Sequence, residues 1–122
     1  MSKPLKSIII KPEYMQICAI CAKPFVEIHH AIHGTANRAL ADKEQLIVPL
    51  CPEHHNSSKM SVHQNKEMRT LMHQFAQASW ERNYMAKKLA NVDRDGLDIQ
   101  TVEEWTDEAR EAFRSIFGQS WI

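Results

Sequence analysis

The sequence contains no hydrophobic run long enough to cross a bilayer. Its most apolar short stretch is three isoleucines at positions 8–10, which lie between Lys6 and Lys11 and are too few for the apolar part of a secretory signal. These absences argue against a membrane or exported protein, so we expect a soluble protein of the cytoplasm. With 122 residues, no internal repeat and no low-complexity linker, the chain suits one compact domain.

The sequence also lacks net charge, because its 15 basic side chains balance 15 acidic ones. The charge is nevertheless unevenly distributed. Residues 92–122 hold eight acidic and three basic side chains, an excess of five negative charges, and residues 1–91 carry the matching positive excess. A basic front part suits a polyanion-binding core, while the acidic tail is equally well explained as an ordinary solvated helix surface. No segment has the clustered arginines that indicate base-specific reading of DNA.

Cysteine is scarce, and the three present form an odd number, which argues against a disulfide framework in a reducing compartment. Their spacing is more informative. Two residues separate Cys18 from Cys21, and two separate Cys51 from His54. Pairs at this spacing can present both donors to one tetrahedral zinc ion, and the two pairs together predict a structural Cys₃His site.

The chain has more histidines than this zinc site can use. Seven are present, and His29, His30, His33 and His55 all lie between or directly beside the two ligand pairs. A tetrahedral structural zinc has no position left for them. Histidines clustered next to a metal site therefore indicate a second, open metal site.

The segment that holds these residues predicts a small α+β fold. Residues 25–28 alternate apolar and polar side chains and favour a strand that ends at the histidine pair, and residues 46–48 fit a second strand. Between them, residues 31–44 are interpreted as a loop, and Pro52 favours the start of a short helix. Residues 1–17 are expected to form a lead-in with one short strand. This ββα arrangement has too small a core to be stable by packing alone, so zinc would contribute to folding.

The second half of the chain is predicted to be helical, which divides the domain into a zinc-bound core at 1–63 and a helical extension at 64–122. A helix over residues 65–91 would carry one apolar stripe formed by Met68, Leu71, Met72 and Phe75. Trp80 and Tyr84 would lie on another face and receive a last helix. That helix is expected to begin at Thr106 as N-cap, to have Asp107 and Glu108 in its first turn, and to end at Gly118.

The motifs in the first half resemble a known family. Cys18 and Cys21, a strand ending in His29 and His30, a loop, and the run Val-Pro-Leu-Cys-Pro-Glu-His-His at 48–55 are together similar to the HNH endonuclease superfamily, which has a ββα-metal, treble-clef-like core. More narrowly, the stretches 29–38, 48–55 and 61–65 resemble small HNH-like proteins of phages and prophages, some of which are linked to phage DNA recombination. The resemblance covers about residues 16–84.

The resemblance implies a role for each matching histidine. His30 would be the general base that takes a proton from the attacking water, since an imidazole with the ordinary pKa of about 6.5 suits this task near neutral pH. His29, His55 and His63 would bind a catalytic divalent cation, Mg²⁺ or Mn²⁺. His33 is an alternative to His63 in that role.

The asparagine of the family name is not in its usual place before the second strand, where Gln45 stands. Asn37 is the favoured substitute as the residue that orients the base, and Asn56 is another candidate. Arg38 or Lys59 could clamp the neighbouring phosphate, and each also has an ordinary interpretation as a solvated surface residue.

The resemblance and the surplus histidines together predict a metal-dependent endonuclease that hydrolyses phosphodiester bonds in DNA during phage or prophage DNA processing or recombination. Two alternatives remain open. One is a catalytically inactive zinc module that binds nucleic acid. The other is a protein-interaction module whose acidic C-terminal helices dock onto a second copy of the chain or onto a phage recombination protein.

Overall fold

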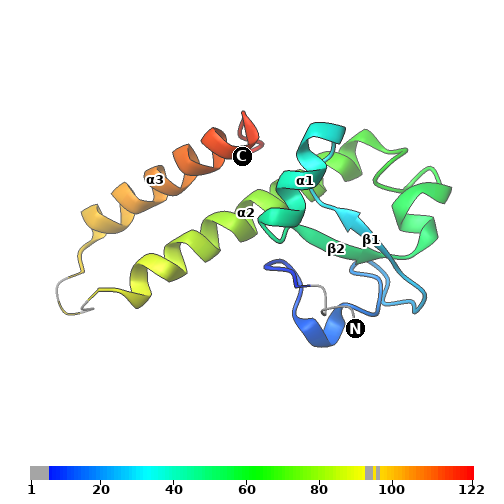
Figure 1. Ribbon diagram of the computed structural model, residues 1–122, viewed down its shortest axis with the longest axis horizontal. Helices are drawn as coiled ribbons and strands as arrows, with labels where there is room; N and C mark the ends of the chain where they lie inside the picture. Colours follow the sequence, from blue (N-terminus) through cyan, green and yellow to red (C-terminus); the bar gives the residue numbers. More distant parts are fainter. Residues whose placement is uncertain (1–5, 93–94, 96) are drawn as a thin grey trace.

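The computed structural model describes residues 6–92, 95 and 97–122 of the chain. In chain order its elements are η1 (Pro12–Tyr14), β1 (Glu27–His30), α1 (Thr35–Lys43), β2 (Ile47–Leu50), η2 (Glu53–Ser57), α2 (Lys66–Ala90) and α3 (Ile99–Phe117). Figure 1 shows α2 and α3 side by side as a hairpin, with the strands and short elements gathered around the first half of α2. The protein is therefore a small, mainly helical α+β fold, as the sequence predicts at that level.

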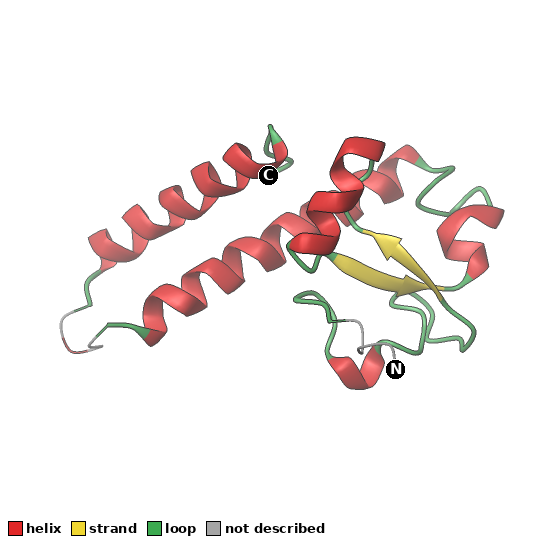
Figure 2. Ribbon diagram, in the orientation of Figure 1, coloured by secondary structure: helices red, strands yellow, loops and turns green. Residues whose placement is uncertain are grey.

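The sheet consists of two antiparallel strands (Figure 2). In the register, His29 pairs with Val48 and His30 with Ile47. The first strand begins two residues later than predicted and ends, as predicted, with the histidine pair. All four residues of β2 are buried, and Pro49 is tolerated there because a strand in a two-stranded sheet needs hydrogen bonds on one side only.

Residues 31–44 are not the predicted loop, because most of them form α1. Gly34 has φ of 115°, a conformation that side chains with a Cβ rarely adopt, and it lets the chain turn from β1 into the helix. The turn-like residues after it are followed by strong helix formers, and Ala41 is fully buried in the core. The prediction failed because the turn signal marks only the start of this segment.

The lead-in also differs from its prediction. Within the described part of the first 17 residues there is no strand, and η1 is the element present. The hydroxyl of Ser7 accepts the backbone N–H groups of Ile9 and Ile10, at 3.0 and 3.2 Å. These local hydrogen bonds replace the ones a sheet would supply. The predicted helix after Pro52 exists as the short π-helix η2, and Lys59 lies beyond its end.

The long helix α2 confirms the prediction for residues 65–91 closely. Asn65 is its N-cap, and the side chain accepts the N–H of Met68 at 3.0 Å. The predicted apolar stripe is buried only in part. Met68 and Met72 pack against the core, whereas the side chains of Leu71 and Phe75 are 55% and 66% exposed.

The last helix packs against α2 where expected but begins earlier. Trp80 of α2 contacts Phe113 of α3 with ring centroids 5.7 Å apart, and the Tyr84 hydroxyl donates to Glu108 at 2.7 Å. Asp98, not Thr106, is the N-cap, and its carboxylate accepts the N–H of Thr101. Thr106 lies inside the helix, with its hydroxyl bonded to a backbone carbonyl, so Asp107 and Glu108 are not in the first turn either.

The end of α3 is as predicted. Gly118 adopts a left-handed conformation with φ of 82° and donates its N–H to the carbonyl of Arg114. One face of this helix is apolar, and its residues Ala109, Phe113 and Phe117 are buried.

Two apolar clusters hold the fold together. The larger joins residues from both predicted segments of the chain, namely Ala31, Ile32, Ala41, Leu46, Ala76, Trp80, Phe113 and Phe117. The smaller surrounds the cysteines and contains Cys18, Val48, Leu50, Cys51 and Val62. Among the described residues, no helix has the length and apolar character needed to cross a membrane.

Candidate functional site

The three cysteines and His54 come together in one cluster, as the sequence predicts. Cys18 and Cys21 lie in a tight turn, closed by a 2.8 Å hydrogen bond from the Ala22 N–H to the Cys18 carbonyl. A bond from the Ala19 N–H to the Pro49 carbonyl fastens this turn to β2. Cys51 directly follows that strand. The strand therefore holds both halves of the cluster together.

The donor atoms are spaced as a tetrahedral ion requires. The Sγ atoms of Cys21 and Cys51 are 3.6 Å apart, and Nδ1 of His54 lies 3.6 Å from Cys18 Sγ and 3.2 Å from Cys51 Sγ. Zinc bonds of about 2.3 Å to sulfur and 2.0 Å to nitrogen would place two sulfurs roughly 3.8 Å apart and a sulfur and a nitrogen roughly 3.5 Å apart. Both the chemistry and the spacing of this donor set fit a metal ion such as zinc.

The environment of Cys18 favours its thiolate form. Burial is the largest single influence and raises its pKa, but hydrogen bonds from the backbone N–H groups of Cys51, Cys21 and Ile20 act together in the opposite direction and lower the pKa to about 6. The thiolate is the form that binds metal. The pKa of Cys21 is raised; its backbone contact at Lys23 lowers it, but burial and the neighbouring thiols outweigh that contact.

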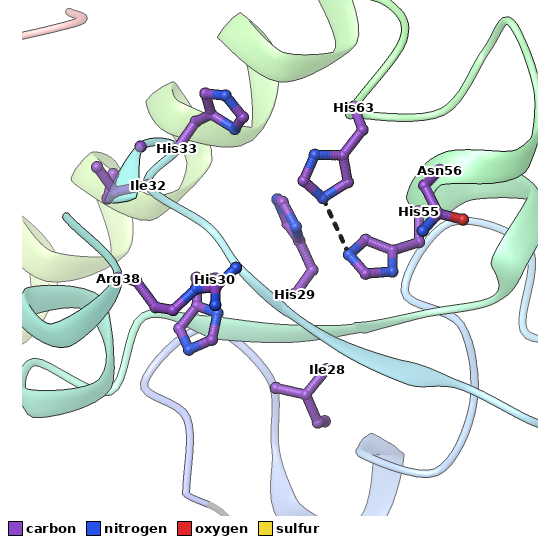
Figure 3. Close-up of a pocket in the computed structure, with 10 residues that line it drawn as sticks. Ile28, His29, His30, Ile32, His33, Arg38, His55, Asn56 and His63 are labelled. Atoms are coloured by element: carbon purple, nitrogen blue, oxygen red, sulfur yellow. Dashed lines mark hydrogen bonds between the residues drawn. The ribbon is translucent and has the colours of Figure 1, made fainter. Parts of the chain in front are cut away.

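Three further histidines form a second cluster. One ring nitrogen from each of His29, His55 and His63 lies within 4.8 Å of the others. His29 comes from β1 and His55 from η2, while His63 follows η2 and is bound to it by a hydrogen bond from its N–H to the His55 carbonyl. Figure 3 shows the three rings pointing toward one another. This is the ligand set that the family resemblance implies.

The surroundings of His29 and His63 disfavour the charged form of their rings. His29 is 4% exposed, and burial, followed by the charge of His55, lowers its pKa to about 3. Burial also lowers the pKa of His63. His55 has Nδ1 3.0 Å from the Glu27 carboxylate, which can only accept, so Nδ1 carries a proton and in the neutral ring the lone pair is on Nε2. Neutral imidazole is the metal-binding form of histidine.

The cluster opens into a pocket of about 520 Å³. Its lining includes His29, His55 and His63, together with His30, Arg38 and Asn56. Lys59, the other predicted phosphate-binding residue, is exposed and does not line this pocket. Of the two residues proposed to clamp a phosphate, the structure therefore brings only Arg38 to the histidines.

A second arginine near the pocket was not predicted. After burial and the neighbouring histidines, the charges of Arg69 and Arg38 are further causes of the lowered pKa of His63. Arg69 likewise contributes to the lowered pKa of His33, for which burial is the main cause. It lies in the first turns of α2. Within the described residues, neither arginine takes part in a salt bridge.

The predicted base and its predicted partner do not contact one another. Nε2 of His30 lies 2.8 Å from Oδ1 of Asp42 in α1, whereas the side-chain amide of Asn37 donates to the His33 carbonyl at 3.0 Å. Asn37 therefore braces the turn between β1 and α1, and the carboxylate of Asp42 is the group that contacts the imidazole. Gln45 lies in the turn after α1, and its N–H donates to the Asp42 carbonyl.

His33 and His73 connect this turn to α2. The N–H of His33 donates to Nε2 of His73 at 2.8 Å, and the ring of His73 packs against Trp121 with centroids 4.6 Å apart. Burial is the main cause that lowers the pKa of His73 to about 4. His73 thus has a structural role, because it joins the turn after β1 to the C-terminal residues. His33 lies beside His63, with ring centroids 5.6 Å apart, but outside the three-histidine cluster.

Two of the residues that sequence reasoning missed are carboxylates. Glu27 could have been found, because it lies two residues before His29 and alternate residues of a strand share a face. Asp42 could not, since its segment was interpreted as a loop. Comparisons with protein-family models, with curated proteins and with solved structures find no match to this chain.

Proposed function

We propose that this protein is a metal-dependent endonuclease of the HNH type that hydrolyses phosphodiester bonds in DNA. The observation that carries the proposal is that two consecutive histidines belong to two different clusters of possible metal ligands. His54 belongs to the cysteine cluster and His55 to the three-histidine cluster. One short element, η2, thus joins a closed four-ligand set to an open three-ligand set beside a pocket.

The first set is proposed as a structural zinc site formed by Cys18, Cys21, Cys51 and His54. It supplies four donors, which leaves no position for substrate, and two of its cysteines are buried. The zinc-stabilised ββα-metal core expected from the sequence, with α1 inserted between its strands, is part of this proposal.

The second set, His29, His55 and His63, is proposed to hold the catalytic divalent cation. Three protein ligands leave open coordination positions, as in catalytic metal sites. Nitrogen donors suit a transition-metal ion such as Mn²⁺ better than Mg²⁺, which prefers oxygen. When bound there, the cation would neutralise charge on the phosphate and on the leaving oxygen.

His30 is proposed as the general base. Its free ring nitrogen takes a proton from a water molecule, and the water oxygen forms a bond to phosphorus. The phosphorus bond to one ester oxygen then breaks, and that oxygen leaves with the electron pair and is protonated from solvent. Arg38, which lines the same pocket, and Arg69 nearby would hold the phosphates of the strand.

A plasmid-nicking assay tests this function. The parent protein, with Mn²⁺ or Mg²⁺ supplied, is expected to convert supercoiled plasmid to the nicked form. His30→Ala should reduce the rate about 100-fold or more, because general base catalysis contributes on that order. Gln119→Ala, an exposed position on the far end of the chain, serves as a control for purification and should cleave as the parent does.

The alternatives give different outcomes in the same experiment. Absence of cleavage with either metal, together with salt-sensitive DNA binding, would replace the nuclease by a catalytically inactive zinc module. If His30→Ala cleaved as fast as the parent, the assignment of the base would be wrong. Size measurement in solution tests whether the acidic C-terminal helices form a homodimer.

A further inference from the structure

The contact between His30 and Asp42 determines which nitrogen of the His30 ring carries the proton. The two atoms involved are Nε2 of His30 and Oδ1 of Asp42, 2.8 Å apart. An ionised carboxylate has no proton to donate and can only accept. The hydrogen between them therefore belongs to Nε2, and in the neutral ring the lone pair must then be on Nδ1.

We propose that Asp42 is a positioning residue that holds His30 in the tautomer protonated on Nε2, and so makes Nδ1 the nitrogen that accepts the proton from water. The part of this inference that concerns the reaction rests on the proposed nuclease function. The part that concerns the tautomer rests only on the contact itself.

The fold explains how Asp42 comes to this place. It lies in the last turn of α1, twelve residues after His30, and α1 packs against β1. The helix is anchored in the core through the fully buried Ala41, the residue directly before Asp42. The carboxylate is thus presented to the strand end by a packed helix, while its own side chain remains 62% exposed.

A second carboxylate near the pocket also contacts a histidine ring, but at the other ring nitrogen. Glu27 binds Nδ1 of His55, which leaves Nε2 of that ring directed at Nε2 of His63. Asp42 binds Nε2 of His30, which leaves Nδ1. A carboxylate therefore selects the tautomer of each ring, and the two rings present different nitrogens for different tasks.

Asp42 takes over the role that the sequence suggested for Asn37. The amide of Asn37 is occupied with the His33 carbonyl and does not reach His30. A carboxylate differs from an amide in two respects. It admits one tautomer only, and its negative charge stabilises the positive charge that the ring acquires when it takes a proton.

Nitrogen NMR of the zinc-loaded, full-length protein tests the tautomer without any assay of activity. The ring of His30 is identified by comparison with His30→Gln, and spectra are recorded at mildly alkaline pH. We expect Nε2 to carry the proton in the parent, and Asp42→Asn to give a mixture of tautomers. Asp107→Asn, which removes an exposed carboxylate of α3, should leave the His30 signals unchanged. A proton on Nδ1 in the parent, or an unchanged spectrum in Asp42→Asn, overturns the inference.

Cleavage rates test the consequence for the reaction. Asp42→Asn should lower kcat by about 10-fold to 100-fold with little change in KM, as is common for groups that orient a functional histidine. Asp42→Glu, which keeps the carboxylate, should recover part of the loss, and Asp107→Asn should cleave as the parent does. Because Asp42 is exposed, both variants are expected to unfold at the parent's temperature.

The failure of each proposal can be recognised separately. A parent that does not cleave DNA contradicts the nuclease, and the NMR result still decides the tautomer. A parent that cleaves, with Asp42→Asn cleaving equally fast, contradicts the positioning role and leaves the nuclease in place.

Discussion

The Nε2 atoms of His55 and His63 lie 3.1 Å apart. Glu27 occupies Nδ1 of His55, so the nitrogen of His55 that faces His63 has a lone pair and no proton. A neutral His63 ring can donate its Nε2–H to this lone pair, and a bound cation would take the place of that proton. Tetrahedral ligands with metal–nitrogen bonds of about 2.0 Å are roughly 3.3 Å apart, close to this spacing. The spacing therefore also suits the cation that we propose at this cluster.

Loss of one of these rings should therefore remove one ion and not the other. We expect the parent to hold one tightly bound zinc per chain and a second, exchangeable ion. His63→Ala should weaken binding of the exchangeable ion by at least about 10-fold, since it deletes one ligand of three. Metal analysis after dialysis measures the tightly bound zinc, and calorimetric titration with Mn²⁺ measures the affinity for the exchangeable ion. Lys66→Ala, an exposed neighbour at the start of α2, is the control. Unchanged Mn²⁺ affinity in His63→Ala would contradict the site.

The cysteine cluster should control stability, not activity alone. Two of its members, Cys18 and Cys51, belong to the smaller core cluster, whose other buried side chains are those of Val48, Leu50 and Val62. Structural zinc contributes on the order of 10 kcal/mol to the folding of small zinc domains. Cys51→Ser, or a strong chelator, should therefore abolish the cooperative thermal transition of this part of the chain. His63→Ala should shift the transition by only a few degrees. Equal effects of the two substitutions would show that the clusters do not have separate roles.

The buried His73 should make the protein less stable in mild acid. Its ordinary pKa is about 6.5, and burial, as the main cause, lowers the pKa to about 4 in the folded state. As the pH falls from 6.5 to 4, the unfolded chain takes up a proton that the folded chain refuses. The free energy of unfolding must then decrease, by up to about 1.4 kcal/mol per pH unit.

The variant His73→Gln isolates this contribution. Glutamine can still accept the His33 N–H through its carbonyl oxygen but does not titrate. The difference in unfolding free energy between variant and parent, measured by urea titration at several pH values, should shift in favour of the variant as the pH falls through this window. Release of metal in acid is expected to destabilise both proteins equally, so it does not contribute to the difference in unfolding free energy between them. A difference that does not change with pH would refute the prediction.

Two substitutions distinguish the observed start of α3 from the predicted one. Asp98→Ala removes the carboxylate that caps the Thr101 N–H and should reduce the free energy of unfolding by about 1 kcal/mol. Thr106→Ala changes a residue inside the helix, where alanine is the better helix former, and should be neutral or slightly stabilising. Urea unfolding measures both. A larger loss in Thr106→Ala than in Asp98→Ala would contradict the observed boundary.

Features that depend on near neighbours in the chain could be predicted. The spacing of Cys18 and Cys21, and of Cys51 and His54, requires only that each pair lie in one turn. The long helix was predicted within a residue at each end, because its caps, Asn65 and Asn91, and its periodicity are local. Gly118 stops α3 for the same reason, since a left-handed residue favours glycine wherever it occurs.

Features that depend on burial were predicted less well. Residues 31–44 contain turn signals, and they also contain Ala41. Ala41 lies in the larger core cluster with residues of α2 and α3, and this burial favours the helix. Leu71 and Phe75 have the periodicity of a buried stripe and are exposed. Sequence periodicity identifies a face but not what covers it.

The sequence by itself determined the ligand types, their local spacing, the long helix α2 and the C-terminal end of α3, because these follow from contacts within a few residues. Only the tertiary structure decided that Glu27 binds His55 and that Asp42 rather than Asn37 contacts His30. The residues of these two pairs are 28 and 12 positions apart in the chain. Both contacts depend on how α1, β1 and η2 pack together, which no local pattern encodes.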